Sequence, residues 1–600
     1  MSKPKAIGRR DFFKGAAAGA AAASLAAGQQ TDLSDQMLND TKAPEWVNVG
    51  APNRLERYTK IGQPIDLHGR KMVFTSYEYM LPAASPAWYD DQEKNVSVIG
   101  TGDLWNAHLK PSEDVPTGIR LTAQPAQNSK APYEIERTKP WERDGVSLSD
   151  VMFDQEMEMH WAGNILFDED DGYFKAWGHC SSNGTTYRCY LQSKDLQNWE
   201  RPNLGLIDFN GNRNNNLIQV KDKELFGYVF KDPSSREERW KWLLEGFATF
   251  EQLERYRKKR ALAYDPKALR LNLQGKRVTG YKLLAVTGGV SPDGFRWTTL
   301  PDPVVIEHSD MLHCSYYDVE SKRYVAYFRT YAMPAYSHHT QIDDHGQNWK
   351  SARRSIGRSE TDNFREFPLS EMIVDPAPDF FGPSDTFYTN THTFVPGTKD
   401  QHLFFSTVWH QDMDTTSVYV AASRDGRIVH WLPGNPVFGT SAFGEWDGGC
   451  LFSLPDLLET PSGDWVLPYI GFNVPHKYPR RGAFKYGFGW ATWPKGRFTA
   501  IEAKQRGQFT TYAFIPPGRK IRLNALTDRA GKGILVEVVD MSKKVLPGRS
   551  FEDCNPILGD QQNALVTWKG EADLNAPNGA PIALRFRMDN AKLFSVDFAD

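Results

Sequence analysis

Cysteine and long apolar runs are both scarce in this sequence of 600 residues. Its five cysteines are scattered, and no two of them form a Cys-x-x-Cys pair, so a disulfide framework is excluded and a zinc site of that kind is disfavoured. No run beyond the first 30 residues is apolar enough to span a bilayer. The net charge of −3 comes without a basic stretch, and we therefore expect no nucleic-acid partner.

The N-terminal stretch "GRRDFFKGAAAGAAAASLAAG" has a twin arginine, Arg9 and Arg10, ahead of a weakly apolar Ala-rich run. This resembles a bacterial twin-arginine export signal, and we assign it to residues 1–29. The run is too short and mild for a stable membrane span, and no cysteine is present for a lipid anchor. We expect passage through the twin-arginine translocon, then a periplasmic or extracellular protein with no membrane partner. The alternative is an unexported Ala-rich helix.

Aromatic residues are abundant, at 13%, and many of them belong to a repeated phrase. In this phrase Ser and Asp are followed within a few residues by an aromatic residue. Asp-Gly favours a tight turn because both residues accept positive φ, and the aromatic residue then begins the next strand. The phrase occurs at 193–202, 291–303, 359–367 and 423–436, with a degenerate copy at 491–501.

A second pattern precedes each phrase: an apolar strand, an acidic or Gly-containing turn, and an aromatic strand. It occurs at 164–179, 228–248, 314–330, 393–410 and 451–472. Each unit therefore reads as about four antiparallel strands, and five such units predict an all-β fold, a five-bladed β-propeller. Helical periodicity is rare. The exception is a charged stretch at about 250–275, which we interpret as a partly helical insertion in the second blade.

The repeat sets the expected domain boundaries. We place the propeller at 146–504 and, because strand alternation continues without the repeated phrase, a β-sandwich at 505–600. Residues 30–145 are Pro-rich and irregular, and we expect them to wrap over the propeller.

The phrases "GYFKAWG", "SPDGFRW" and "NWERPNLGLIDFNGNRNNN", on a propeller followed by a sandwich, resemble a bacterial branch of the invertase, levansucrase and arabinanase group of glycoside hydrolases. The resemblance covers most of residues 150–600. It implies hydrolysis of a plant or algal oligo- or polysaccharide with no required cofactor. The group's Asn-Asp-Pro-Asn and Glu-Cys phrases are missing, so its nucleophile and acid cannot be carried over. Its Arg-Asp-Pro phrase has a near match in "FKDP", which implies a sugar-binding or stabilising role for Asp232.

Each blade also offers polar groups where its inner strand begins, and such groups should point into the axial funnel. Glycoside hydrolysis needs two carboxyl groups, one protonated and one ionised. The candidates for catalysis are Glu158, Asp232, Asp385, Glu445 and Asp447. The candidates for substrate binding are His160, Trp161, Asp310, His313, Tyr388, Asn390, His392, Trp446 and His476.

The stretch "FGEWDGGC" at 443–450 supplies the leading candidate. Glu445 would be the acid if the neighbouring indole of Trp446 lowers its solvation, with Asp232, Asp385 or Glu158 as its partner. Glu445 and Asp447 could instead act together or bind an ion, and a structural calcium ion in the funnel is compatible with these carboxylates. The alternative is a turn capped by Asp447, with Glu445 paired to an arginine.

Two other functions remain open. In a polysaccharide lyase, Tyr388 and His392 would serve as base or acid, and Arg480 or Arg481 would neutralise a uronate carboxylate. The histidines could also hold a metal. In a non-catalytic propeller, aromatic faces would only bind a glycan.

Overall fold

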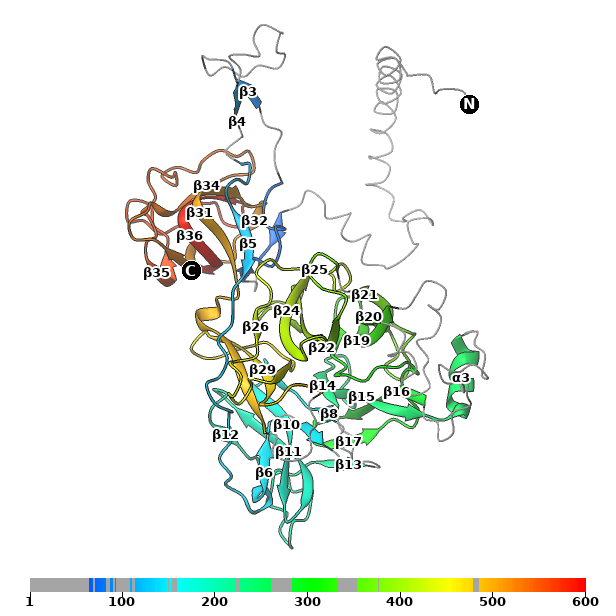
Figure 1. Cartoon of the computed structure of the whole chain (residues 1–600). Coiled ribbons are helices and arrows are strands. Elements are labelled where there is room, and N and C mark those ends of the chain that lie inside the picture. Colours follow the sequence, from blue (N-terminus) through cyan, green and yellow to red (C-terminus); the bar gives the residue numbers. More distant parts are fainter. Residues whose placement is uncertain are drawn as a thin grey trace, which may run out of the picture. The chain divides into compact units, whose positions relative to one another are not determined.

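The computed structural model describes residues 64–600 apart from 68–70, 83–86, 90–91, 93–107, 111–113, 149, 154–158, 222–226, 261–282, 333–352, 376 and 478–484. Residues Pro64–Asp600 form one compact unit (Figure 1). The predicted export signal, residues 1–29, lies outside the described residues. No helix within the described part of the chain has the length and apolar character needed to cross a bilayer.

Five sheets follow one another along the chain, each with its inner strand first, as in a propeller. The first sheet contains β6 (Gly145–Ser147), β9 (Ile165–Asp168), β10 (Tyr173–Ser182), β11 (Thr185–Ser193) and β12 (Trp199–Glu200). The second contains β14 (Tyr228–Lys231), β15 (Trp240–Ala248), β16 (Leu283–Ser291) and β17 (Arg296–Thr299), with β13 (Gln219–Lys221) outside. The helix α3 (Phe250–Arg260) joins β15 to β16, so the predicted insertion begins as expected; its residues 261–275 lie outside the described part.

The third sheet contains β18 (Ser315–Asp318), β19 (Arg323–Ala332), β20 (Arg353–Thr361) and β21 (Glu371–Val374). The fourth contains β22 (Asp385–Phe394), β23 (His402–His410), β24 (Thr415–Ser423), β25 (His430–Trp431) and β26 (Phe438–Gly439). The fifth contains β27 (Cys450–Ser453), β28 (Leu458–Glu459), β29 (Trp465–Phe472) and β30 (Tyr486–Trp493). The five predicted units therefore correspond one by one to five sheets, which we call blades 1 to 5.

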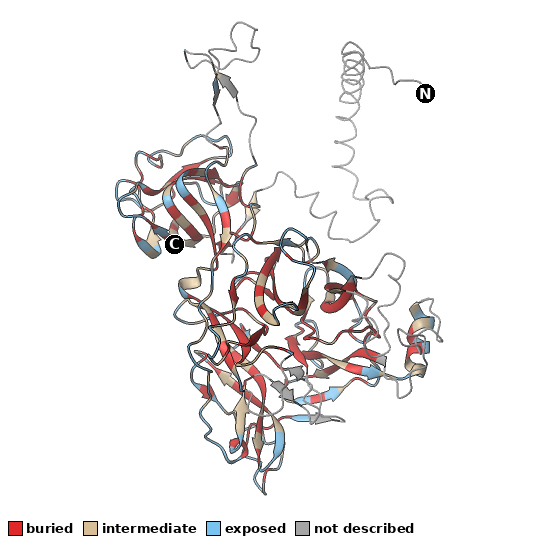
Figure 2. Ribbon diagram, in the orientation of Figure 1, coloured by how far each residue is buried: buried red, intermediate tan, exposed pale blue. Residues whose placement is uncertain are grey.

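Apolar side chains close these sheets into a ring, as the buried residues along the strands in Figure 2 illustrate. Each neighbouring pair of blades shares a buried apolar cluster, and blade 5 shares one with blade 1. The clusters are represented by Trp177 with Trp240 (blades 1 and 2), Phe230 with Phe328 (2 and 3), Tyr327 with Phe404 (3 and 4), Val418 with Tyr469 (4 and 5), and Phe472 with Phe174 (5 and 1). The prediction of a five-bladed propeller is confirmed.

The repeated Ser-Asp phrase is a repeated turn. In blade 1 the Asp195 carboxylate accepts hydrogen bonds from the backbone N–H groups of Gln197 (2.9 Å) and Asn198 (2.7 Å) and from Ser193 Oγ (3.0 Å). Asp293 in blade 2 and Asp425 in blade 4 make the same set of bonds. Such bonds satisfy turn donors that a strand cannot pair, which explains why the phrase recurs at the same point of the repeat.

Blade 5 lacks the phrase for a structural reason. After β30 the chain leaves the propeller, so no strand of its own follows. Residues before the propeller fill the outer position instead: Gln127 exchanges backbone hydrogen bonds with Thr492 (2.9 Å each), and Tyr133 N–H donates to Phe488 O (2.7 Å). Part of the predicted N-terminal wrap therefore lies along this blade.

The C-terminal region is a bent seven-stranded sheet. Its strands are β31 (Thr499–Thr510), β33 (Lys520–Thr527), β34 (Gly533–Val539), β35 (Asp560–Leu565) and β36 (Ala583–Ala599), together with β2 (Met72–Val73) and β5 (Arg120–Ala123). The sequence placed the boundary at 505, which falls inside β31, and placed residues 30–145 over the propeller. The structure instead pairs β5 with β31 and β2 with β36, so this N-terminal segment also completes the C-terminal sheet.

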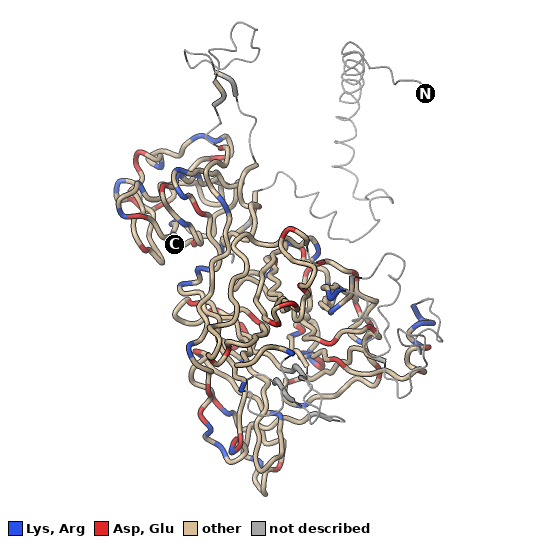
Figure 3. The backbone as a smooth tube through the Cα atoms, viewed as in Figure 1, with Lys and Arg blue, Asp and Glu red and all other residues tan. Residues whose placement is uncertain are grey.

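The remaining short strands form small pairs: β1 (Ile65–Asp66) with β32 (Phe514–Ile515), β3 (Ala87–Tyr89) with β4 (His108–Lys110), and β7 (Asp150–Phe153) with β8 (Met159–Ala162). Basic and acidic residues are intermixed over the described part (Figure 3), in keeping with the near-neutral net charge. All five cysteines are buried and free.

Candidate active site

The inner strands of a propeller run in one direction around its axis, so their starting ends meet at one end of the ring, which we call the mouth. Their far ends turn into hairpins at the other end, which we call the hairpin end. At the mouth, Asp310 precedes β18. Its side chain is 30% exposed, although the groups around it, Arg329, His308 and Tyr331, are buried. The carboxylate is therefore the exposed part of an otherwise buried cluster, and we call Asp310 with Arg329, Arg354, His308 and Tyr331 the recess.

Asp310 is held ionised in this recess. Arg329 Nη1 binds its Oδ1, His308 Nε2 lies 3.7 Å from the same oxygen, and Arg354 Nη2 lies 4.0 Å from Oδ2. Burial opposes ionisation, but Arg329, His308 and Arg354 outweigh it and hold the pKa of Asp310 well below its usual range. Asp310 is thus a carboxylate at any physiological pH.

Tyr388 of β22 joins blades 3, 4 and 5 at this point. Its ring centroid lies 5.3 Å from the guanidinium carbon of Arg329, 5.0 Å from that of Arg354, and 4.3 Å from the ring centroid of His476. The pairing of β22 with β23 shifts register between Phe387 and Thr389, so Tyr388 is the bulged residue. Bulges redirect side chains, and here one carries Tyr388 toward the axis. Three predicted residues, Asp310, Tyr388 and His476, therefore come together.

Asp385 also lies at the mouth, as predicted, at the first position of β22. Its Oδ1 lies 2.7 Å from His410 Nδ1, and His410 Nε2 lies 2.7 Å from Ser417 Oγ. Its Oδ2 accepts a hydrogen bond from the backbone N–H of Gly382 (2.7 Å). The carboxylate is thus positioned by neighbours on its own blade.

Asp456 is a carboxyl group that the sequence reasoning missed. It follows β27 in blade 5, yet it accepts hydrogen bonds from Asn164 Nδ2 of blade 1 (3.1 Å) and from Tyr228 OH of blade 2 (3.0 Å). It also acts electrostatically on Cys314, just ahead of β18 in blade 3. A side chain that reaches three other blades must lie at the axis. The signal in the sequence was an acid within an apolar run, "LFSLPDLLE".

Burial raises the pKa of Asp456 to about 7, and the hydrogen bonds from Asn164 and Tyr228 only partly offset this. Among the described residues, no cationic side chain contributes to this shift, in contrast to the arginines around Asp310. The propeller therefore has two carboxyl groups with opposite protonation preferences, Asp310 at the mouth and Asp456 at the axis. Environments that separate two pKa values in this way are typical of acid–base catalysis.

A hairpin of blade 1 interrupts the inner strand near these groups. Both β6 and β9 pair with β10, at residues 179–181 and 173–176, and run in the same direction. They form one interrupted inner strand, from which β7 and β8 leave as a separate hairpin. His160 and Trp161 lie on β8, paired with Met152 and Val151. Glu158 lies outside the described residues.

Asp232 does not lie with this group. It follows β14 at the hairpin end, is fully buried, and forms an ion pair with Lys241 (2.7 Å). It also accepts hydrogen bonds from Ser234 Oγ (2.6 Å) and Tyr324 OH (2.6 Å). Burial opposes its ionisation, but Lys241, Ser234 and Tyr324 prevail and lower its pKa. These partners occupy the carboxylate, so the expectation of a role in the funnel is corrected.

The stretch "FGEWDGGC" also differs from its interpretation. Trp446 stacks on Tyr469 (centroids 5.5 Å apart, 24° between planes) and donates from Nε1 to Ser129 O (3.0 Å). Asp447 is fully buried and accepts hydrogen bonds from Asn128 Nδ2 (3.1 Å) and Tyr469 OH (2.8 Å). Glu445 is exposed, so the indole does not desolvate it. The stretch anchors blade 5 to the N-terminal segment.

Three further predicted residues are buried in the walls. His313 lies within hydrogen-bonding distance of Ser309 Oγ (2.9 Å), and burial lowers its pKa to about 3. His392 Nε2 lies 2.9 Å from His402 Nδ1, stacks on Tyr316 (5.2 Å), and burial holds its pKa well below its usual value. Asn390 is fully buried and accepts a hydrogen bond from Ser406 (3.0 Å). Neither histidine is poised to carry a proton near neutral pH.

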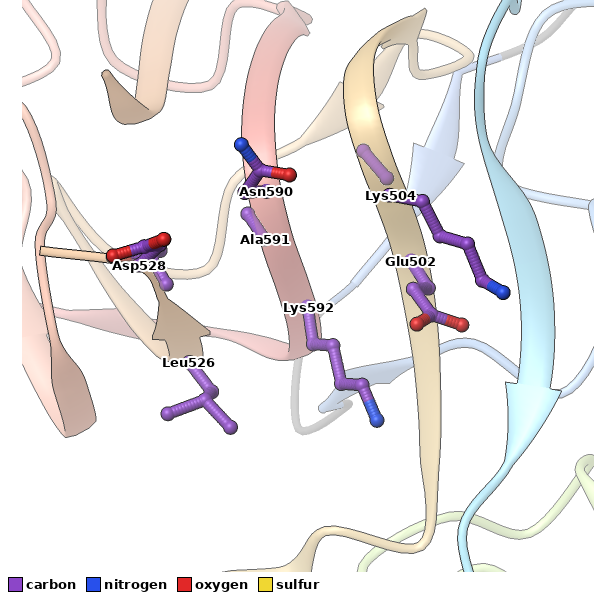
Figure 4. Close-up of a pocket in the computed structure, with 9 residues that line it drawn as sticks. Glu502, Lys504, Leu526, Asp528, Asn590, Ala591 and Lys592 are labelled. Atoms are coloured by element: carbon purple, nitrogen blue, oxygen red, sulfur yellow. The ribbon is translucent and has the colours of Figure 1, made fainter. Parts of the chain in front are cut away.

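Among the described residues, no group of three or more His, Cys, Asp or Glu side chains could hold a metal ion. The structure also has hollows outside the propeller. The one in Figure 4, about 460 Å³, lies on the C-terminal sheet and is lined by Glu502, Lys504, Asp528 and Lys592 among others. The Glu502 carboxylate is already bound by Arg120 (2.7 Å), and Lys592 donates to Gln124 (2.8 Å). The first contact joins β5 to β31, and the second joins β36 to the residue that follows β5.

No protein-family model and no curated protein matches the chain. Solved structures that resemble it include an α-L-arabinanase of Penicillium chrysogenum complexed with arabinobiose (11% identity, TM-score 0.28, 57% of this chain and 88% of that one). A second is a β-fructofuranosidase of Bombyx mori (8% identity, TM-score 0.30, 73% of this chain and 91% of that one). A third is an N-acetylgalactosamine deacetylase of F. plautii in complex with blood group B trisaccharide (12% identity, TM-score 0.30, 62% of this chain and 96% of that one). At these low scores, function has to be drawn from the side chains of the propeller itself.

Proposed function

We propose that the protein is a glycoside hydrolase that cleaves an oligo- or polysaccharide in the axial funnel. The observation that supports this most is a pair of carboxyl groups with opposite pKa shifts: the pKa of Asp310 at the mouth lies well below its usual value, and that of Asp456 at the axis is about 7. Hydrolysis of a glycosidic bond needs this division: a protonated group assists the leaving oxygen, and an ionised one acts as nucleophile or as base for water.

In this proposal Asp456 is the acid and Asp310 is the ionised partner. Asp385, fixed by His410, is a further carboxylate at the mouth and stays a candidate for the second role. Tyr388 and Trp409, which are partly exposed and have ring centroids 6.2 Å apart, offer candidate ring faces at the mouth. Such faces suit stacking on the C–H face of a sugar.

A second candidate function is a polysaccharide lyase. It is favoured by Tyr388, whose ring lies near two guanidinium groups and beside His476. In a lyase a base removes the proton α to a uronate carboxylate, and cations neutralise that carboxylate. The arginines are Arg329 and Arg354 rather than the predicted Arg480 and Arg481, which lie outside the described residues. His392 is too deeply buried for the role that the sequence suggested.

One screen separates these functions. Plant and algal polysaccharides are incubated with the protein, and new reducing ends are measured together with ultraviolet absorbance. Reducing ends without absorbance support hydrolysis, and both together support a lyase, whose product has an unsaturated uronate. Asp310→Asn should reduce hydrolysis at least about 100-fold. Asp412→Asn, an exposed acid after β23, serves as the matched control. Binding without any product would show a glycan-binding propeller and reject both enzymes.

The proposal includes export by the twin-arginine translocon to the periplasm or the medium, based on Arg9 and Arg10. Replacing both with lysine should retain the protein in the cytoplasm. Secretion of the double variant at the normal level would reject this route. The structural calcium ion considered from the sequence stays a prediction, and loss of thermal stability on chelation would support it.

A further inference from the structure

The recess at the mouth has more positive than negative charge. Arg329 and Arg354 both approach Asp310, and Asp310 is the one carboxylate that lies within 4.0 Å of either among the described residues. Arg329 is 1% exposed, and its Nε and Nη2 atoms have no hydrogen-bond partner there. A buried guanidinium that uses only part of its donors is costly unless something binds the rest. The recess is therefore built for an additional acceptor.

The position of the two guanidinium groups identifies where that acceptor would lie. Both are near the ring of Tyr388, with 5.3 Å and 5.0 Å from their central carbons to its centroid. The side chain of Arg354 is 14% exposed and that of Asp310 is 30% exposed, so the recess is open to solvent. Planar guanidinium groups bind carboxylate and sulfate oxygens in a fork, which a neutral hydroxyl cannot match.

We propose that the sugar bound in the funnel carries an anionic group, a uronate carboxylate or a sulfate ester, which binds to Arg329 and Arg354 beside Tyr388. This rests on the proposed function and names its substrate class. The carboxylate of Asp310 holds Arg329 in place and leaves Arg354 directed at the ligand. The ring of His476 lies 4.3 Å from that of Tyr388 in an edge contact.

The experiment measures binding separately from turnover. The Asp456→Asn variant keeps the recess unchanged and slows cleavage, so it is used as the background. The probes are oligosaccharides of polygalacturonate and their carboxyl-reduced forms, and oligosaccharides of a sulfated carrageenan and their desulfated forms. Titration calorimetry gives the dissociation constant of each. At least one anionic probe should bind about tenfold or more tightly than its neutral counterpart, and added salt should reduce the difference. A preference for polygalacturonate over its carboxyl-reduced form would indicate a carboxylate ligand, and a preference for carrageenan over its desulfated form would indicate a sulfate ester.

Two variants locate the effect. Arg354→Gln should abolish the preference for the anionic probe, while Arg354→Lys, which keeps the charge without the fork, should retain part of it. Arg323→Gln is the matched control, since Arg323 lies on the same blade at the hairpin end, is 37% exposed, and pairs with Glu360. It should leave the preference unchanged. Near-ultraviolet circular dichroism verifies the fold of each variant.

Equal affinity for charged and neutral probes, or no binding of any anionic probe, would overturn the inference. So would a preference that survives Arg354→Gln. Hydrolysis of neutral polysaccharides without charge dependence would leave the proposed hydrolase intact and remove only the anionic substrate. Tight binding of an anionic probe that the wild-type protein never cleaves would support the anionic ligand and reject the proposed hydrolase.

Discussion

The two ends of the propeller use acidic residues in different ways. At the hairpin end, Asp168 and Asp232 follow the inner strands β9 and β14, and each pairs with a lysine on the next strand, Lys175 at 2.6 Å and Lys241 at 2.7 Å. Burial opposes ionisation of both, yet the lysines prevail and lower both pKa values. The repeat has placed the same structural ion pair in two successive blades.

At the mouth and along the axis the acids differ from one another. Asp310 has arginines and an open recess, Asp385 has a histidine, and Asp456 has only neutral donors. At the hairpin end lysines neutralise both acids: Lys241, which is 1% exposed, binds Asp232, and Lys175 and Lys231 bind Asp168. Acids with unequal surroundings in one shared space have the means to divide acid and base roles.

The largest expected effect is on turnover, at the axis. Asp456→Asn removes an axial carboxyl group whose pKa is raised to about 7, and general acid catalysis contributes about 10²- to 10⁴-fold. We expect kcat to fall by that amount on the substrate found in the screen, with the melting temperature unchanged or raised, since the amide retains bonding to Asn164 and Tyr228. Steady-state kinetics and calorimetry measure the two quantities. A kcat equal to that of the wild type in this variant would show that Asp456, like the acids at the hairpin end, has only a structural role.

At the hairpin end the effect should be on stability. Asp232→Asn leaves the ammonium of Lys241, 1% exposed, without its counter-charge. Removing one partner of a buried ion pair costs about 3–5 kcal/mol, so the free energy of unfolding should drop by that amount. Urea unfolding measures it. Activity per folded molecule should not change, and the Asp232→Asn, Lys241→Met double variant should recover most of the stability. A catalytic defect in folded Asp232→Asn would show that the hairpin end takes part in the chemistry.

The pH profile tests the same contrast without mutation. The folded-state pKa of Asp456, about 7, lies above its ordinary value of 3.8, so folding favours the protonated form. The contribution of Asp456 to the free energy of unfolding is fully present below pH 3.8 and is lost as the pH rises through 7. The acid role requires the same protonated form. We expect kcat/KM to fall about tenfold per pH unit above 7, and the melting temperature of the wild type to drop relative to Asp456→Asn over pH 5–8. A flat profile up to pH 9 would exclude Asp456 as the acid.

The sequence predicts the ring well and the site only in part, for a common reason. The Ser-Asp turn and the strand pattern are local, so five blades could be counted. The pairing of β2 with β36 joins Met72 to Val596, and no local pattern indicates it. The repeat also predicts how far along the propeller axis a residue lies, but not to which face of its strand the side chain points. Bulges decide that, as the register shift at Phe387/Thr389 does for Tyr388.

The same reasoning explains which acids were misjudged. Asp447 has the right level for a funnel residue, yet its carboxylate faces Tyr469 and Asn128. Asp456 stands within an apolar run that reads as core. An acid in such a run is the stronger signal, since burying it without a cation is expensive and calls for a reason.

The smallest expected effect concerns Glu445. The Glu445→Gln substitution removes a charge from an exposed side chain with no hydrogen bond or ion pair of its own among the described residues. Trp446 beside it already stacks on Tyr469 and donates to Ser129. The change should therefore alter kcat and KM by less than about twofold and the free energy of unfolding by less than about 0.5 kcal/mol, with no measurable shift of the melting temperature. The sequence alone predicts the opposite, complete loss of turnover. If Glu445→Gln abolishes activity while Asp456→Asn does not, the acid lies on the rim of the mouth, and the axial pair has only a structural role.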